Sequence, residues 1–217
     1  RGPDSAGNWI DTNSGLALGH TRLAIQDLSI AGNQPMISNN NRFIIIFNGE
    51  IYNHLELRKE LYSNKQSYNW KGHSDTETIL ACLEFWGIDK TLIALKGMFA
   101  IAIWDLANRE LYLSRDIMGE KPLYFGWGRE VFYFASELKA LQEHTFFIKE
   151  INKSAVKSLM EFSYIKTPYS IFKNIFKLYP GTVLKAKIGI NKDISINYPK
   201  INFEYKSFKI FQWWSLK

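Results

Sequence analysis

The feature that most constrains the fold is a series of short, almost uninterrupted apolar runs separated by turn residues. Residues 98–105 and 110–115 form one pair of such runs, and residues 122–127 and 131–135 form a second pair. Each pair predicts a β-hairpin, because a few turn-forming residues join two runs of strand length. The runs lack the alternation of a half-exposed strand, so both faces of their sheets are expected to be covered.

A further buried strand is predicted over residues 42–47, whose sequence is RFIIIF. Asn48 and Gly49 follow it, and this pair favours a tight turn that would end the strand. Residues 53–62 place leucines among charged residues and predict a short surface helix after the turn. The order of strand, turn and helix indicates that helices are layered on the sheets.

Charge and cysteine content narrow the class of protein. The chain has 27 Lys and Arg against 21 Asp and Glu, and 13 of the lysines lie within residues 149–217. These lysines are dispersed among aromatic residues, so we interpret them as a solvated face and expect no nucleic-acid partner. No apolar run approaches the ~20 residues of a membrane helix, and the single cysteine, Cys82, cannot form an intramolecular disulfide. We therefore expect a soluble, cytoplasmic protein without a membrane partner.

Asn48 and Gly49 are also candidate catalytic residues. A glycine directly after a strand lets a substrate approach the backbone, and the Asn48 side chain supplies an amide donor beside it. These two donors suit an oxyanion hole, although an Asn-Gly pair taken alone is more often a simple turn.

Two charged residues suggest a site for an amino acid. Arg22 lies within an otherwise apolar strand predicted over residues 15–25, where a buried guanidinium requires a carboxylate partner or an anionic ligand. Asp75 stands at the start of a helix predicted over residues 74–86, and Ser74 can supply its N-cap, which leaves Asp75 free to hold an ammonium group. Together with an oxyanion hole, these residues describe a site for a free α-amino acid that undergoes acyl chemistry.

Eight motifs, in order along the chain, resemble the class II glutaminase domain of glutamine-hydrolysing asparagine synthetases. The resemblance covers nearly the whole chain, and the ordered set is far more specific than any one motif. The motifs are RGPD (1–4), HTRLAI (20–25), NGEIYNH (48–54), SDTE (74–77), KGMFAIAIWD (96–105), RDIMGEKPLY (115–124), SELKAL (136–141) and WWSL (213–216).

The resemblance implies an α+β fold, a four-layer α-β-β-α sandwich of the N-terminal-nucleophile hydrolase type, incomplete at its N-terminus. It also implies an enzyme that releases ammonia from L-glutamine. A cysteine exposed by Met removal attacks the glutamine side-chain amide, and its own α-amino group serves as general base. The ammonia then serves the ATP-dependent amidation of aspartate. ATP and Mg²⁺ are therefore expected in a separate synthetase domain, and no cofactor or metal is expected in this one.

Carried over position by position, the resemblance assigns Arg22 to the glutamine α-carboxylate, and Asp75 and Glu50 to its α-ammonium group. The Asn48 side chain and the Gly49 backbone would form the oxyanion hole. Residues 23–26 would line the pocket through their backbone, which tolerates Ala24 where many family members have Ser. The glutamine-binding residues expected are therefore Arg22, Leu23, Ala24, Ile25, Gln26, Asn48, Gly49, Glu50 and Asp75.

One departure from the family pattern concerns the nucleophile. The family's cysteine lies upstream of the RGPD motif, at which this sequence begins, so we expect this piece of chain to hydrolyse no glutamine alone. Cys82 is no substitute, because it lies mid-helix without a free α-amino group, and we interpret it as a buried structural thiol. Residues 1–190 are expected to form the glutaminase domain, and residues 191–217 an edge strand or a linker into the synthetase domain.

Two alternative functions stay open at this stage. One is an amidotransferase of the same family that aminates another carboxylate, such as a sugar acid. The other is a non-catalytic domain that binds an amino acid, as expected if the complete gene also lacks the upstream cysteine. The partners expected are L-glutamine, the C-terminal synthetase domain and, as the resemblance allows, a second copy of the chain in a homodimer.

Overall fold

The computed structural model describes residues 2–129, 131–187, 200–205 and 208–215. The helices in these ranges are α1 (His54–Ser63), α2 (Asp75–Ala94), α3 (Leu138–Gln142) and α4 (Lys153–Phe162), with a short 3-10 turn at Ile30–Gly32. The strands in the same ranges are β1 (Ser5–Asp11), β2 (Leu16–Arg22), β3 (Met36–Ile37), β4 (Phe43–Ile51), β5 (Gly97–Asp105), β6 (Glu110–Arg115), β7 (Tyr124–Gly128), β8 (Val131–Ala135), β9 (Ile175–Lys177), β10 (Thr182–Lys187), β11 (Phe203–Tyr205) and β12 (Phe208–Gln212).

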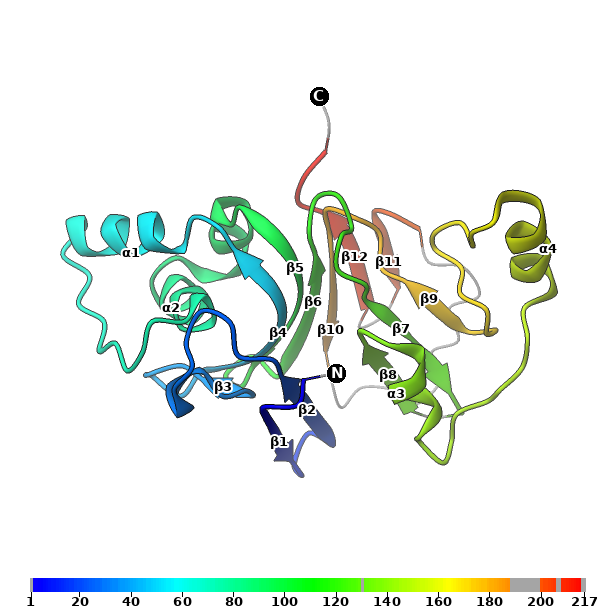
Figure 1. Cartoon of the computed structure of the whole chain (residues 1–217), viewed down its shortest axis with the longest axis horizontal. Coiled ribbons are helices and arrows are strands. Elements are labelled where there is room, and N and C mark those ends of the chain that lie inside the picture. The colour runs from blue at the N-terminus through cyan, green and yellow to red at the C-terminus, as the bar shows by residue number, and fades with distance from the viewer. Residues whose placement is uncertain (1, 130, 188–199, 206–207, 216–217) are drawn as a thin grey trace.

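The strands form a large sheet, a small sheet and a separate hairpin. The large sheet has the order β11-β12-β10-β6-β5-β4-β3, the small sheet has the order β8-β7-β9, and β1 pairs with β2. In Figure 1, α1 and α2 lie on one side of the large sheet, the small sheet lies on its other side, and α4 lies beyond the small sheet. Leu141 of α3 packs on the small sheet in a cluster with Tyr133, apart from the cluster between the two sheets. The four layers confirm the expected α-β-β-α sandwich.

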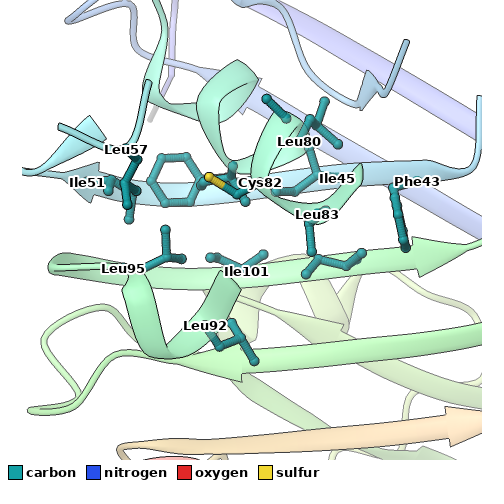
Figure 2. Packing of buried hydrophobic residues seen from close by; sticks show 14 of the residues in the cluster. Phe43, Ile45, Ile51, Leu57, Leu80, Cys82, Leu83, Leu92, Leu95 and Ile101 are labelled. Atoms are coloured by element: carbon teal, nitrogen blue, oxygen red, sulfur yellow. The ribbon is translucent and has the colours of Figure 1, made fainter. Parts of the chain in front are cut away.

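Both faces of the large sheet are buried, as the apolar runs predict. Along β4, Phe43 and Ile45 pack in the cluster beneath the helices, whereas Ile44 packs in the cluster between the two sheets. Leu80 and Leu83 of α2 cover the first face (Figure 2). Since each such side chain stabilises the fold by ~1.5–3 kcal/mol when buried, the two clusters hold the layers together.

The two predicted hairpins are confirmed. β5 pairs with β6 so that Asp105 lies opposite Glu110, and β7 pairs with β8 so that Gly128 lies opposite Val131. Both are local structures, formed by neighbouring runs with short connections, which is why their sequence pattern sufficed.

The expected turn at Asn48 and Gly49 is wrong. β4 continues through both residues to Ile51, and Gly49 lies opposite Phe99 of β5. A Cβ atom on residue 49 would lie 2.1 Å from the carbonyl oxygen of Met98. The glycine is therefore required by the close approach of β5 and not by a turn.

The helix predicted over residues 74–86 does end at Gly87, whose φ of 75° lies in the left-handed region. A second helical segment, which the sequence does not predict, follows the kink and continues α2 to Ala94. The periodicity ends at this glycine, but Leu92 of the following segment is buried in the same cluster as the first part of the helix. Packing against the sheet, and not local pattern, explains the second segment.

The C-terminal part of the described chain extends the large sheet. β12 pairs with β10, and β11 pairs with β12 at the end of the sheet. The Trp213 ring stacks on Phe99 with 6.0 Å between ring centroids, and its backbone N–H donates to the Gly181 carbonyl at 3.0 Å. Much of the expected linker, including residues 191–199, lies outside the described residues. None of the helices described has both the length and the apolar character that a membrane span requires.

Candidate functional site

A cavity of about 960 Å³ opens between the β1-β2 hairpin, the end of β4 and the junction of β8 with α3. Ala24 is the one expected glutamine-binding residue that does not line it, and its backbone N–H donates to the Asp4 carboxylate at 2.7 Å. The other eight expected residues line this cavity, and they are Arg22, Leu23, Ile25, Gln26, Asn48, Gly49, Glu50 and Asp75.

The edge of β4 determines how Gly49 is presented to the cavity. In an antiparallel sheet, successive residues direct their backbone groups to opposite sides of the strand. The backbone of Phe47 and Ile51 points away from β5, since the Phe47 N–H donates to Gln34 Oε1 at 2.6 Å and the Ile51 N–H donates to Asp75 Oδ2 at 2.9 Å. Gly49 lies midway between them in the same register. Its N–H and C=O groups therefore also project from the strand edge, at the cavity wall.

The Asn48 side chain reaches the cavity from the face of β4 that is directed toward the small sheet. Its Nδ2 donates to Ser136 Oγ at 3.0 Å, and Ser136 also lines the cavity. This bond uses one of the two amide protons and leaves the second for a ligand. Asn48 and Gly49 thus present a side-chain donor and a backbone donor to one cavity, which is what a developing oxyanion requires.

Asp75 begins α2 and is only 6% exposed. Ser74 is the N-cap, because its Oγ accepts from the Glu77 N–H at 3.2 Å. The Asp75 carboxylate accepts instead from Ile51, as given above, and from the Thr76 N–H at 2.8 Å. Burial raises the pKa of Asp75, although these two hydrogen bonds act to lower it. A carboxylate buried in this way at a cavity wall favours a cationic ligand.

Arg22 ends β2 and is 8% exposed. Its guanidinium donates to the Ser29 carbonyl at 2.8 Å, to Asn33 Oδ1 at 3.0 Å and to the Asp27 carbonyl. These partners are neutral oxygens of the loop that follows the strand, whereas the sequence indicated a carboxylate or an anionic ligand. Because a guanidinium has five N–H donors, the loop orients Arg22 without using all of them.

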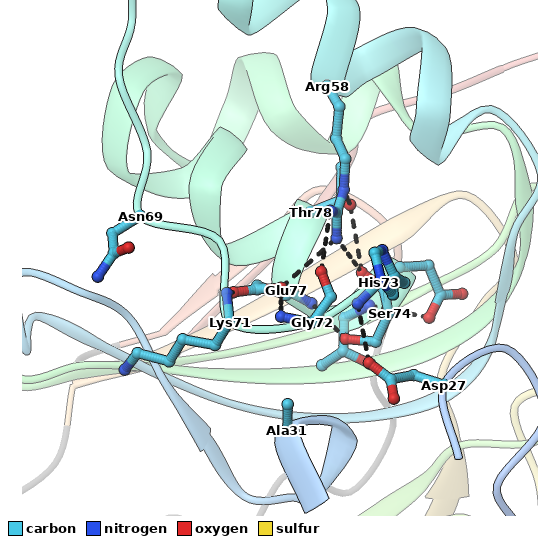
Figure 3. A network of polar contacts seen from close by, with 12 residues as sticks. Asp27, Ala31, Arg58, Asn69, Lys71, Gly72, His73, Ser74, Glu77 and Thr78 are labelled. Carbon is cyan, nitrogen blue, oxygen red and sulfur yellow. Dashed lines mark hydrogen bonds and ion pairs between the residues drawn. The ribbon is translucent and has the colours of Figure 1, made fainter. Parts of the chain in front are cut away.

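A polar network at the cavity wall fixes the segment that leads into α2. Arg58 of α1 donates to the Ser74 carbonyl at 2.9 Å. Asp27 accepts from the His73 N–H at 2.8 Å and so joins the same segment to the loop after β2 (Figure 3). The hydrogen bond from the Ser29 side chain contributes most to lowering the pKa of Asp27 to about 2. The start of α2, with Asp75, is therefore held from two sides.

Two cavity residues that the sequence does not predict as site residues contact strand β4. Gln34 comes from the loop before β3 and His20 comes from β2, and both contact the backbone of Phe47. The sequence offers little signal for either, because Gln34 stands in a polar loop and His20 is one of four scattered histidines.

Cys82 lies in the core and not at the cavity. It is fully buried in α2, and burial raises the pKa of its thiol to about 12. These are the properties of a structural thiol. In the part of the chain that the structure describes, no three His, Cys, Asp or Glu side chains gather as metal ligands.

The sequence matches the family model of the glutamine amidotransferase domain over residues 1–196. It is 38% identical over 205 residues to asparagine synthetase [glutamine-hydrolyzing] 1 of Bacillus subtilis, covering 94% of this chain and 31% of that protein. It is also 38% identical over 200 residues to putative asparagine synthetase [glutamine-hydrolyzing] 2 of Methanocaldococcus jannaschii, covering 82% of this chain and 37% of that protein. The chain thus spans about a third of the length of these curated relatives.

The fold is shared with a solved structure. Glutamine phosphoribosylpyrophosphate amidotransferase from B. subtilis superposes with a TM-score of 0.58 at 19% identity, over 91% of this chain and 34% of that chain. At this identity the likeness concerns the fold alone. It agrees with the sandwich of the N-terminal-nucleophile hydrolase type that the motifs imply.

Proposed function

The chain belongs to the glutamine amidotransferase domain family, and from this membership we propose that it is the glutaminase portion of a glutamine-hydrolysing asparagine synthetase. In this proposal it releases ammonia from L-glutamine for the ATP-dependent amidation of aspartate. The observation that carries the proposal is that one cavity gathers the Asn48 and Gly49 donors and the buried carboxylate of Asp75.

The cavity suits the two ends of a glutamine molecule. Asp75 and Glu50 would hold the α-ammonium group, and Arg22 would hold the α-carboxylate through donors that the neighbouring loop leaves available. Leu23, Ile25 and Gln26, in the loop after β2, line the cavity and would flank the bound substrate. This binding mode directs the substrate's side-chain amide toward the donors on β4.

The chemistry then follows from the two donors. A cysteine thiolate attacks the side-chain carbonyl carbon, and its π-electron pair moves onto the oxygen to form a tetrahedral oxyanion. The Asn48 amide and the Gly49 N–H would stabilise that charge. The α-amino group of the cysteine takes the thiol proton and passes it to the amide nitrogen, which leaves as ammonia as the oxyanion collapses to a thioester. Water then hydrolyses the thioester, which forms glutamate and frees the thiol. The family resemblance assigns the nucleophile to a segment upstream of the RGPD motif, so the tests below use the full-length protein.

The remaining steps concern the rest of a longer protein. The relatives are about two to three times as long as this chain, and ATP, Mg²⁺ and aspartate would bind in the synthetase domain that the resemblance implies. No described residue is assigned to them. A cytoplasmic location, expected from the cysteine content of the sequence, and a homodimer, which the resemblance allows, belong to the proposal.

The test compares two nitrogen sources in the full-length protein. With ATP, Mg²⁺ and aspartate, asparagine should form from glutamine and also from added ammonia, and glutamate should appear only in the first reaction. Amidation of a sugar acid without any asparagine would support the alternative acceptor. A protein that contains the upstream cysteine but yields no glutamate from glutamine would refute the glutaminase assignment.

A further inference from the structure

The backbone N–H and C=O groups of Phe47 form hydrogen bonds with side chains and not with a neighbouring strand. β3 pairs only with Ile44 and Ile45 of β4. Beyond that point, the Phe47 N–H donates to Gln34 Oε1 at 2.6 Å, and the Phe47 carbonyl oxygen accepts from His20 Nε2 at 3.1 Å. The residue directly before Asn48 is thus held from the side of the cavity by two polar side chains.

Gln34 also connects β4 to α2. It is 9% exposed, and its Nε2 donates to Thr76 Oγ1 at 3.3 Å. Thr76 follows Asp75 in the first turn of the helix. A single side-chain amide therefore joins the strand that carries the oxyanion donors to the helix that carries the ammonium ligand.

His20 makes the second contact in one defined tautomer of its ring. A carbonyl oxygen can only accept, so the ring must carry its proton on Nε2. Burial lowers the pKa of His20 below its ordinary value, which keeps the ring neutral near pH 7. Among the described residues, none bonds to its buried Nδ1. The contact with Phe47 is accordingly what orients this ring.

We propose that Gln34 and His20 are positioning residues that hold the Phe47 peptide, and through it the Asn48 and Gly49 donors, where the oxyanion forms. This inference rests on the proposed glutaminase function. Because Phe47 and Asn48 share a peptide bond, any movement of Phe47 displaces both donors. A displacement of ~1 Å at a catalytic group can lower a rate ~10²-fold. The loss should appear in kcat and not in glutamine affinity, since Asp75 and Arg22 keep their own supports.

Two substitutions at Gln34 test this clamp, by which we mean the two contacts that Gln34 and His20 make with the Phe47 backbone. Gln34→Met keeps the length of the side chain but removes both hydrogen-bonding groups. Gln34→Glu keeps an oxygen that can accept from the Phe47 N–H, and its second oxygen can accept from the Thr76 hydroxyl. Gln142→Met, at the end of α3 and away from the cavity, is the matched control.

The experiment uses the full-length protein and three measurements. These are kcat at saturating glutamine, the glutamine Kd by titration calorimetry, and hydrogen exchange of the peptide that contains Phe47, read by mass spectrometry. Gln34→Met should lower kcat about tenfold to a hundredfold, change Kd by less than about threefold, and speed exchange at Phe47. Gln34→Glu, which keeps an acceptor for the Phe47 N–H, should restore the protection. Gln142→Met should match the parent protein, and all three variants should keep ammonia-dependent synthesis.

Any outcome that differs from these contradicts one particular step of the argument. A Gln34→Met protein with the parent's kcat refutes the clamp, and so does a fall in kcat without faster exchange at Phe47. A collapse of glutamine affinity with kcat unchanged would make Gln34 a binding residue instead. A parent protein that hydrolyses no glutamine refutes the proposed function itself, and the catalytic role of the clamp with it.

Discussion

Replacing Asp75 with Asn tests the proposed glutamine site most directly. Both carboxylate oxygens are engaged, one with the Ile51 N–H at 2.9 Å and the other with the Thr76 N–H at 2.8 Å. The substitution keeps the shape of the side chain but removes its charge. It also turns one oxygen into an NH₂ group, which cannot accept a hydrogen bond.

Two separate losses follow from that geometry. The glutamine ammonium group loses a charge-assisted contact of ~1.5–3 kcal/mol, which corresponds to about a tenfold to hundredfold weaker Kd. The fold loses an acceptor for one buried backbone N–H, a cost of ~1–3 kcal/mol that relief from burying a charge partly offsets. We therefore expect a large effect on glutamine binding and a lower melting temperature by a few degrees.

Ser74→Ala separates these two effects. Ser74 caps the same helix through its bond to the Glu77 N–H, and loss of such a cap costs ~1 kcal/mol, yet the Asp75 charge remains. Calorimetric titration of glutamine into the full-length variants, beside glutamine-dependent and ammonia-dependent synthesis, is the assay. Ser74→Ala should lose stability but keep its glutamine Kd, whereas Asp75→Asn should lose glutamine use and keep ammonia-dependent synthesis.

A proton measurement adds a second test of the same residue. Burial raises the pKa of Asp75 above its ordinary 3.8, so the folded protein binds this proton more tightly than the unfolded chain does. Ionised Asp75 accordingly costs stability as the pH rises through its folded pKa. A bound ammonium group favours the ionised form, so glutamine binding at a pH near the folded pKa of Asp75 should release protons in the parent protein but not in Asp75→Asn. Equal loss of both synthetic activities, or an unchanged glutamine Kd, would refute the assignment.

Three further outcomes are expected. Asn48→Ala should lower glutaminase turnover ~10²–10³-fold while calorimetry still detects glutamine binding, and a collapse of affinity at unchanged turnover would contradict the oxyanion role. Gly49→Ala should destabilise the fold by ~1–3 kcal/mol in thermal unfolding, because its Cβ would meet the Met98 carbonyl, whereas Gly19→Ala, with nothing within 4 Å of the new Cβ, should stay within about 0.5 kcal/mol of the parent. Cys82, whose thiol pKa is raised to about 12 by burial, should react with iodoacetamide at pH 8 only after denaturation, and rapid labelling of its peptide in the native protein would contradict the buried position.

The parts of the fold that could be predicted from sequence depend on local pattern. The hairpin from β5 to β6 was predictable because its two apolar runs are neighbours in the chain. The turn expected at Asn48 and Gly49 failed because the group that requires a glycine, the carbonyl of Met98, belongs to a strand almost fifty residues away. A local Asn-Gly signal cannot reveal such a contact.

The same distinction applies to the candidate site. Arg22, Asn48, Gly49 and Asp75 could be predicted from the residues themselves, since charged and turn-forming residues in apolar surroundings leave a visible signal. The family resemblance added Leu23, Ile25, Gln26 and Glu50, and all eight residues line one cavity. Gln34 left none, because its importance comes from the strand edge that it meets in three dimensions. Arg22 was recognised as a buried cation, but only the folded loop shows that neutral carbonyls accept its hydrogen bonds.

The arrangement of side chains along the edge of β4 has a consequence for association between molecules. An uncovered strand edge can recruit a strand from another chain and begin aggregation. Here Gln34 and His20 bond to the N–H and C=O groups of Phe47, and Asp75 bonds to the N–H group of Ile51. A foreign strand would find the groups of Gly49 accessible, but three of the neighbouring groups on this edge are already bonded to side chains. The edge can therefore bind a small substrate at one point without acting as a template for intermolecular β-sheet.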